Sequence, residues 1–201
     1  MIADRMRGVT NEFYDYFERA SVGPLWDDSE VASASISSGQ LVVTPLSYSW
    51  ASWNGVIYVG DLNFSGDFEV EGAFDYVSGG SRDLGVVGIA LLDSQYENGV
   101  SINMRDAWAD HTGCLSVRTI DPINGETEVY TTNYGTRPAS GSATYKIVRE
   151  GGTISFYEGG TYRYEYTDQT NFMKLKLVNY AYLNYAYKTA YWDYIKVRRG
   201  G

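Results

Sequence analysis

Three carboxylates stand at same-face positions of one strand-like segment, GDFEVEGAFDYV, and their spacing suits acid–base chemistry. Alternate residues of a strand lie on one face, about 7 Å apart at Cα, so Glu69, Glu71 and Asp75 share a face. Such a pair is compatible with the roughly 5–5.5 Å between nucleophile and general acid in retaining glycoside hydrolysis. A solvated acidic face has the same pattern, because carboxylates cannot be buried unpaired. We favour the solvated face.

Aromatic side chains indicate a different chemistry, the stacking of rings on a ligand. The segment TPLSYSWASWNG places Tyr48, Trp50 and Trp53 among small polar residues, a composition unlike that of a core strand. Rings flanked by Ser and Asn suit the apolar faces of sugars, and they equally suit protein interfaces. For any single ring, closing the edge of a core is the simpler interpretation; for the set, we favour display.

A second aromatic segment, NYAYLNYAYKTAYWDY, lies near the C-terminus. Its tyrosines change parity twice, so a single strand cannot bury them all on one face. We expect a loop or bulge between residues 179 and 189, with Tyr185 and Tyr187 exposed or half exposed near its tip. Together with the first segment, these tyrosines can line one edge of the protein.

The remaining reactive residue types point to structure. His111 is the only histidine and Cys114 the only cysteine, so a Ser–His–Asp triad, a site of several histidines and an internal disulfide are not supported. We expect His111 in a loop and Cys114 as a small buried hydrophobe.

The elements that position these residues are predicted to be strands. The chain has 201 residues, 15% aromatic content with 19 Tyr, and 22 Gly against 4 Pro, which favours an all-β protein with many tight turns. Its formal net charge of −9 argues against nucleic acid and anionic membrane surfaces as partners. No segment is apolar enough to span a bilayer.

Short alternating runs between turn clusters predict a two-sheet antiparallel sandwich. Residues 1–10 read as a flexible arm and 11–199 as one domain. Asn124-Gly125, Gly151-Gly152 and Gly159-Gly160 predict hairpin turns, because these pairs accept positive φ. The predicted strands are residues 34–36, 40–44, 56–59, 67–77, 84–92, 100–103, 115–120, 127–132, 145–149, 153–157, 161–166, 174–178 and 191–198.

Several segments, taken in order, resemble the concanavalin A-like lectin/glucanase superfamily, and within it laminin G-like domains. FYDYFERASVGPLWDD resembles the opening strand and its bend, SASISSGQLVVT the strand after it, and WNGVIYVGDLNFSGDFEVEGAFDYV the approach to the next. YKIVREGGTISFYEGG is similar to the family hairpin, and LKLVNYA…AYWDYIKVRR to the closing strand. The resemblance covers roughly residues 13–198. It implies a jelly-roll sandwich with paired first and last strands, binding carbohydrates or proteins, often with calcium.

The resemblance also allows an enzyme. Family glucanases use the strand motif Glu-x-Asp-x-x-Glu, and the segment from Glu69 to Asp75 departs from it in residue type and spacing. We therefore favour a protein without catalysis. The alternative, a glycoside hydrolase or polysaccharide lyase, uses Glu69, Glu71 and Asp75 and depends on whether residues 67–75 face the concave side.

Calcium is the one cofactor that the resemblance brings in. It needs several converging oxygens, and Asp193 aligns with a family aspartate beside the closing strand. The candidate ligands are Asp193, Asp27, Asp28, Asp106 and Asp110.

We interpret the chain as a recognition or adhesion domain that binds glycan or a protein partner through its aromatic segments. The N-terminus lacks an apolar run long enough for a signal peptide, and virion surface proteins assemble inside the cell before lysis releases them. We therefore expect an extracellular or virion-surface protein, as a homo-oligomer or part of a larger assembly. A purely structural capsid-decoration or fibre subunit without ligand is a further alternative.

Overall fold

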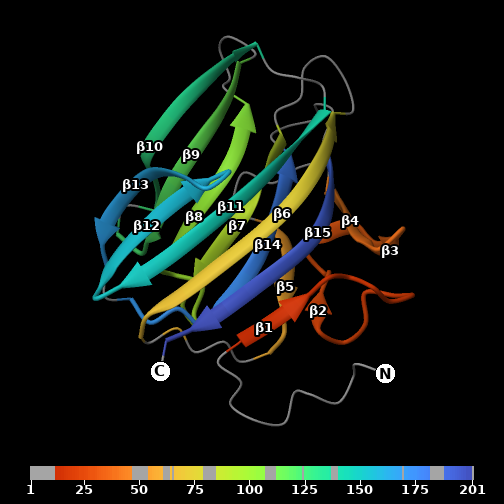
Figure 1. Cartoon of the computed structure of the whole chain (residues 1–201), viewed down its shortest axis with the longest axis horizontal. Coiled ribbons are helices and arrows are strands. Elements are labelled where there is room, and N and C mark those ends of the chain that lie inside the picture. The colour runs from red at the N-terminus through yellow and green to blue at the C-terminus, as the bar shows by residue number, and fades with distance from the viewer. Residues whose placement is uncertain are drawn as a thin grey trace.

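Two antiparallel β-sheets pack face to face in the computed structural model (Figure 1). No helix that is long and apolar enough to cross a membrane occurs in the described part of the chain. The structure describes residues 12–46, 54–60, 64, 66–78, 85–106, 112–123, 125–136, 140–168, 170–181 and 188–200.

The larger sheet has eight strands, seven of them in the order β13-β12-β11-β6-β15-β4-β3. The eighth, β1, pairs with the end of β15, with Glu12 opposite Arg198, which confirms the expected pairing of first and last strands. The strands of this sheet are β1 (Glu12–Asp15), β3 (Val31–Ser37), β4 (Gln40–Pro45), β6 (Phe68–Ser78), β11 (Ser140–Glu150), β12 (Thr153–Glu158), β13 (Thr161–Thr167) and β15 (Lys188–Arg199).

The smaller sheet has seven strands in the order β10-β9-β8-β7-β14-β5-β2. Strand β14 lies between β7 and β5, so segments far apart in the sequence meet at its two edges. The strands are β2 (Trp26–Asp27), β5 (Gly55–Tyr58), β7 (Gly85–Leu92), β8 (Gly99–Asp106), β9 (Thr112–Asp121), β10 (Gly125–Thr136) and β14 (Lys174–Ala181).

Every strand predicted from the alternation overlaps an observed strand, so the predicted all-β sandwich is confirmed. Gly151 and Gly152 have φ values of 56° and 87°, and Gly159 and Gly160 have 54° and 78°, as two-residue hairpin turns between β11, β12 and β13 require. The hairpin predicted at Asn124-Gly125 is present between β9 and β10, but Gly125 already pairs with Asp121 as the first residue of β10. Asn124 lies outside the described residues.

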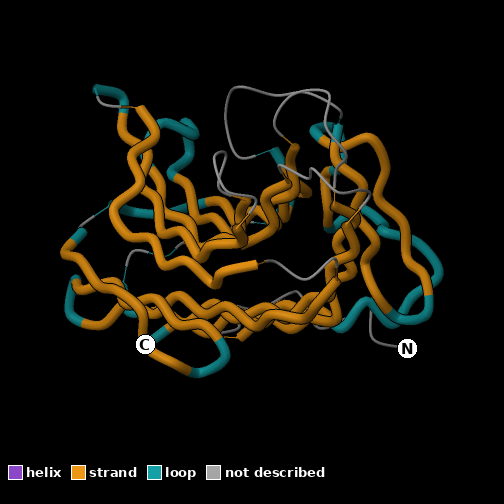
Figure 2. Tube along the Cα trace, turned by 90° about the horizontal axis from the view of Figure 1, so that it is seen from above, coloured by secondary structure: helices purple, strands orange, loops and turns teal. Residues whose placement is uncertain are grey.

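The two sheets are curved, and the smaller sheet bends so that its side facing away from the larger sheet is concave (Figure 2). We call this side the concave face. The outer side of the larger sheet is therefore the convex face. One continuous core lies between the sheets, with Phe74, Trp192 and Tyr145 among its largest fully buried side chains.

Strand β6 shows how the alternation sets the two sides of a sheet. Val70 and Phe74 are fully buried in the core, whereas Glu69, Glu71 and Asp75 are partly exposed on the opposite side. The acidic strand thus faces the convex side. Gly72 belongs to the buried set because a Cβ there would meet Trp192 and Ile195 at 3.0 Å.

Candidate functional site

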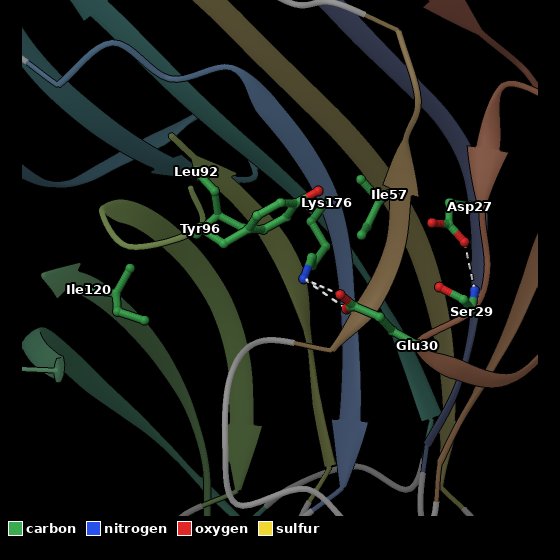
Figure 3. A pocket seen from close by; sticks show the side chains of 8 residues that line it. All are labelled: Asp27, Ser29, Glu30, Ile57, Leu92, Tyr96, Ile120 and Lys176. Carbon is green, nitrogen blue, oxygen red and sulfur yellow. Dashed lines mark hydrogen bonds and ion pairs between the residues drawn. The ribbon is translucent and has the colours of Figure 1, made fainter. Parts of the chain in front are cut away.

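A pocket of about 350 Å³ opens on the concave face of the smaller sheet (Figure 3). Strands β2, β5, β7, β9 and β14 contribute to it, together with the loops that follow β2 and β7. Its polar and apolar side chains are mixed in the way that suits a ligand with hydroxyl groups. The lining residues are Asp27, Ser29, Glu30, Ile57, Leu92, Tyr96, Ile120 and Lys176.

Lys176 supplies the positive charge of the pocket. Leu175 and Leu177 point into the core, so the alternation of β14 turns Lys176 to the concave face. Its Nζ donates to both carboxylate oxygens of Glu30, at 3.1 and 2.8 Å. The Lys176 side chain is only 4% exposed, and a buried ammonium of this kind needs such a partner.

Glu30 reaches Lys176 from the short turn between β2 and β3. The backbone N–H of Val31 donates to the carbonyl of Asp28 at 3.2 Å, which closes that turn. The Glu30 Oε2 also accepts from the N–H of Gly55 at 3.3 Å. The carboxylate is thus fixed from β14 and β5 together.

Tyr96 stands at the edge of the pocket in a strained backbone conformation. Its φ is +61°, which a bulky residue adopts only where its surroundings enforce it. Asp93 does so, because its carboxylate accepts hydrogen bonds from the N–H groups of Gln95, Glu97 and Asn98. The Tyr96 ring lies 5.4 Å from the Lys176 ammonium and is 41% exposed.

The electrostatics of the pocket are dominated by its carboxylates. A hydrogen bond from the Ser29 backbone lowers the pKa of Asp27, with a smaller contribution from Lys176. Burial, together with the negative charges of Glu30 and Asp27, raises the pKa of the Tyr96 hydroxyl. At neutral pH the Asp27 side chain is therefore a carboxylate and the Tyr96 side chain a neutral phenol.

A buried polar network lies beside the pocket on the same concave face. Arg118 on β9 pairs with Glu126 and Glu128 on β10, and Ser116 donates to Glu128 at 2.6 Å. On β8, the Asn103 amide donates to Ser101 Oγ at 2.7 Å. The charges of this network are paired with one another, which favours a rigid surface beside the pocket.

The carboxylates predicted for catalysis lie on the other side of the molecule, on the convex face. Glu69 has ion pairs with Arg198 at 3.4 Å and Lys146 at 3.6 Å. Glu71 accepts from the Tyr194 hydroxyl at 2.9 Å, and Asp75 accepts from Ser142 at 2.5 Å. Neighbouring strands thus supply each of these carboxylates with a partner.

The aromatic residues predicted to bind a ligand, Tyr48, Trp50, Trp53, Tyr185 and Tyr187, lie outside the described residues, as does His111. The strands that flank the two aromatic segments are neighbours, since β4 pairs with β15 and β5 with β14. A common edge for the two segments stays a prediction. Cys114 is buried, as expected.

The predicted calcium ligands do not come together in the described part of the chain. Asp27 lies in the pocket and Asp28 follows it, whereas Asp193 is on β15 of the other sheet, accepting from Gln40 at 2.7 Å. Asp110 and the side chain of Asp106 fall outside the description. No group of three His, Cys, Asp or Glu side chains that could hold a metal occurs among the described residues.

Tyr96, Glu30 and Lys176 are not among the residues that the sequence predicts for a site. The charge at position 176 between two leucines is a signal that could have found one of them, because the alternation Lys174-Leu175-Lys176-Leu177 turns both lysines to the side of the strand opposite the core. The ion pair with Glu30 joins residues 146 positions apart, and no local pattern shows it.

Solved structures with the same fold include proteins that bind and proteins that cleave carbohydrate. The CBM2 module of the evolved Dit of Lactobacillus casei BL23 phage J-1 is 9% identical, with 92% of this chain and 93% of that chain covered and a TM-score of 0.69. The Emp47p carbohydrate recognition domain is 13% identical, with 96% and 97% covered and a TM-score of 0.70. An endo-β-1,3-glucanase from Pyrococcus furiosus is 17% identical, with 93% of each chain covered and a TM-score of 0.67.

No family model matches the chain, and no curated protein matches its sequence. Identities this low show the fold alone, and the narrower resemblance to laminin G-like domains stays a prediction. The chain has the two-sheet jelly-roll fold of the concanavalin A-like proteins, as its sequence predicts.

Proposed function

We propose that the protein is a glycan-recognition domain without catalysis, and that its ligand binds in the concave pocket. The observation that carries this proposal is Tyr96, whose backbone has a strained positive φ at the edge of the pocket and whose side chain is partly exposed there. Strain of this kind gathers at binding and active sites. A half-exposed ring beside hydrogen-bonding groups suits a sugar, which has apolar faces and a rim of hydroxyls.

Hydrolysis is less well supported than binding by the same pocket. A glycosidase needs one carboxyl group that holds a proton at working pH. The pKa of Asp27 is lowered, so Asp27 is a poor proton donor, and Glu30 is tied to Lys176. The acidic strand on the convex face has the ion pairs of a solvated surface.

The binding proposal is tested by screening the protein on a glycan array, with calcium and again with chelator. We expect saturable binding to a defined glycan that Tyr96→Ala weakens at least tenfold with little change in the melting temperature. Tyr162→Ala is the matched control, because Tyr162 is 50% exposed on β13 of the other sheet. Equal loss in both variants, or no glycan binding at all, contradicts the proposal.

The aromatic segments form a separate arm of that test. If they line the binding edge, the double substitution of Tyr185 and Tyr187 by Ala abolishes the binding that Tyr96→Ala weakens, and it leaves stability unchanged. Binding that survives the double substitution assigns recognition to the concave pocket alone. Loss in chelator would bring the predicted aspartates back as calcium ligands.

We infer a virion or cell-surface location for this domain, supported by the likeness to a module of a phage Dit. Assembly without ligand is a second candidate, and strand β3 favours it. This edge strand, VASASIS, has seven uncharged residues, and an uncharged edge is open to pairing with another strand. Sedimentation equilibrium of Ser35→Lys against the parent chain tests it. An unchanged oligomeric state excludes pairing through β3.

A further inference from the structure

The charges of the concave pocket do not cancel, and this imbalance is a specificity signal. Lys176 is the one basic side chain among the eight that line the pocket, against two carboxylates, Asp27 and Glu30. Its ammonium is bonded to both oxygens of Glu30 and lies beside the Tyr96 ring. The Lys176 charge is therefore already matched within the protein.

Asp27 remains as the unmatched carboxylate. It is exposed on β2. Its Oδ1 accepts a hydrogen bond from the backbone N–H of Ser29, in the turn after β2, at 3.0 Å. No ion pair among the described residues involves Asp27, and the nearest pocket cation, Lys176, is held by Glu30. A ligand that enters the pocket meets one net negative charge.

We propose that the pocket takes a sugar with a free, protonated amine, such as a 2-amino-2-deoxyhexose, whose ammonium binds the Asp27 carboxylate. The proposal rests on the proposed function, since it names the glycan class for the same pocket. Tyr96, Leu92 and Ile120 supply apolar surface for the ring of that sugar. The volume of about 350 Å³ lies near the small end of the roughly 300–1,000 Å³ of ligand sites and suits a short glycan unit.

Asp28 is the natural control for Asp27. Both are exposed aspartates at adjacent positions, Asp27 as the last residue of β2 and Asp28 in the turn after it, and only Asp27 lines the pocket. Asp27→Asn keeps an oxygen that can accept from Ser29 and removes the charge. Asp28→Asn removes the same charge from the protein as a whole, so it measures attraction that is unrelated to the pocket.

The experiment is isothermal titration calorimetry with three tetrasaccharides: the tetramer of glucosamine, which has free amines, the tetramer of N-acetylglucosamine, and the tetramer of galacturonate. We expect the parent chain to bind the free amine about tenfold more tightly than the N-acetylated form at low salt, and to bind the galacturonate most weakly. Asp27→Asn should abolish the preference for the amine, and Asp28→Asn should keep it. A preference that both variants reduce equally reports the net charge of the protein and overturns the proposal.

Different results overturn the amino-sugar inference and the proposed glycan recognition on which it rests. Binding of N-acetylated or other neutral glycans that depends on Tyr96 but shows no preference for the amine overturns the amino-sugar inference and leaves glycan recognition standing. Tighter binding of the galacturonate has the same meaning. Absence of binding to every sugar, both in this series and on the array, overturns both levels.

Discussion

Replacing Tyr96 by glycine and by alanine separates the strain of its backbone from the work of its ring. At φ +61°, a residue with a Cβ pays roughly 1–2 kcal/mol that glycine does not. Glycine costs about 0.4–1 kcal/mol more than alanine in the entropy of the unfolded chain. The balance makes Tyr96→Gly more stable than Tyr96→Ala by about 0.5–1 kcal/mol, although both lack the ring.

The assay is urea unfolding of the two variants side by side, with the melting temperature as a second reading. For a chain of 201 residues, about 1 kcal/mol corresponds to about 2–4 °C, so the two should differ by a few degrees at most. Both variants should lose glycan binding equally, because the ring is absent from both. An alanine variant at least as stable as the glycine variant refutes the reasoning. It would mean that the Asp93 loop does not hold position 96 in the left-handed region.

Three further predictions concern the residues around the pocket and on the convex face. Glu30→Gln should lower the free energy of unfolding by about 1–3 kcal/mol, because it leaves the buried Lys176 ammonium without its carboxylate partner, and the partial exposure of Glu30 limits the loss. A double-mutant cycle with Lys176→Met should show a coupling energy above about 0.5 kcal/mol. Additive effects of the two substitutions contradict the pairing. Gly88→Ala should destabilise by about 1–3 kcal/mol or more, because its Cβ would meet the Ile102 carbonyl oxygen, while Gly66→Ala, with nothing within 4 Å, should be neutral. Burial and the hydrogen bond to Glu71 raise the pKa of Tyr194 to about 12 from 10.0, so the contribution of Tyr194 to stability is full below pH 10.0 and is lost as pH rises through about 12. The free energy of unfolding of Tyr194→Phe should lack this pH-dependent loss. The same pH dependence in the variant and the parent chain contradicts the assignment.

Strand β6 and the glycine hairpins could be predicted because their information is local. The alternation of apolar and polar residues in 68–76 sets which side chains face the core. Over an 11-residue strand, the opposite assignment would bury the carboxylates and expose the aromatic residues. Gly151-Gly152 and Gly159-Gly160 mark their turns through backbone freedom alone. The fold class follows from such segments, because they add up to two sheets with one shared core.

The pocket could not be predicted, for two physical reasons. Its ion pair depends on β14 lying beside β5, a long-range pairing that periodicity does not specify. Its aromatic residue also has a backbone conformation that sequence preference argues against, since tyrosine rarely adopts positive φ. Asp93 overrides that preference through three backbone hydrogen bonds, and the aspartate is informative only once the loop is seen.

The two sides of the sandwich use their acidic residues in opposite ways. On the convex face, Glu69 and Glu71 form ion pairs with cations from β11 and β15, so their charges are paired within the protein. On the concave face, the one pocket cation is matched by Glu30, and Asp27 is left over. An excess of acidic residues is by itself only a solvated surface. It becomes selective where a pocket, a partly exposed aromatic ring and an unmatched carboxylate coincide, and in the described part of the chain that coincidence is at Asp27.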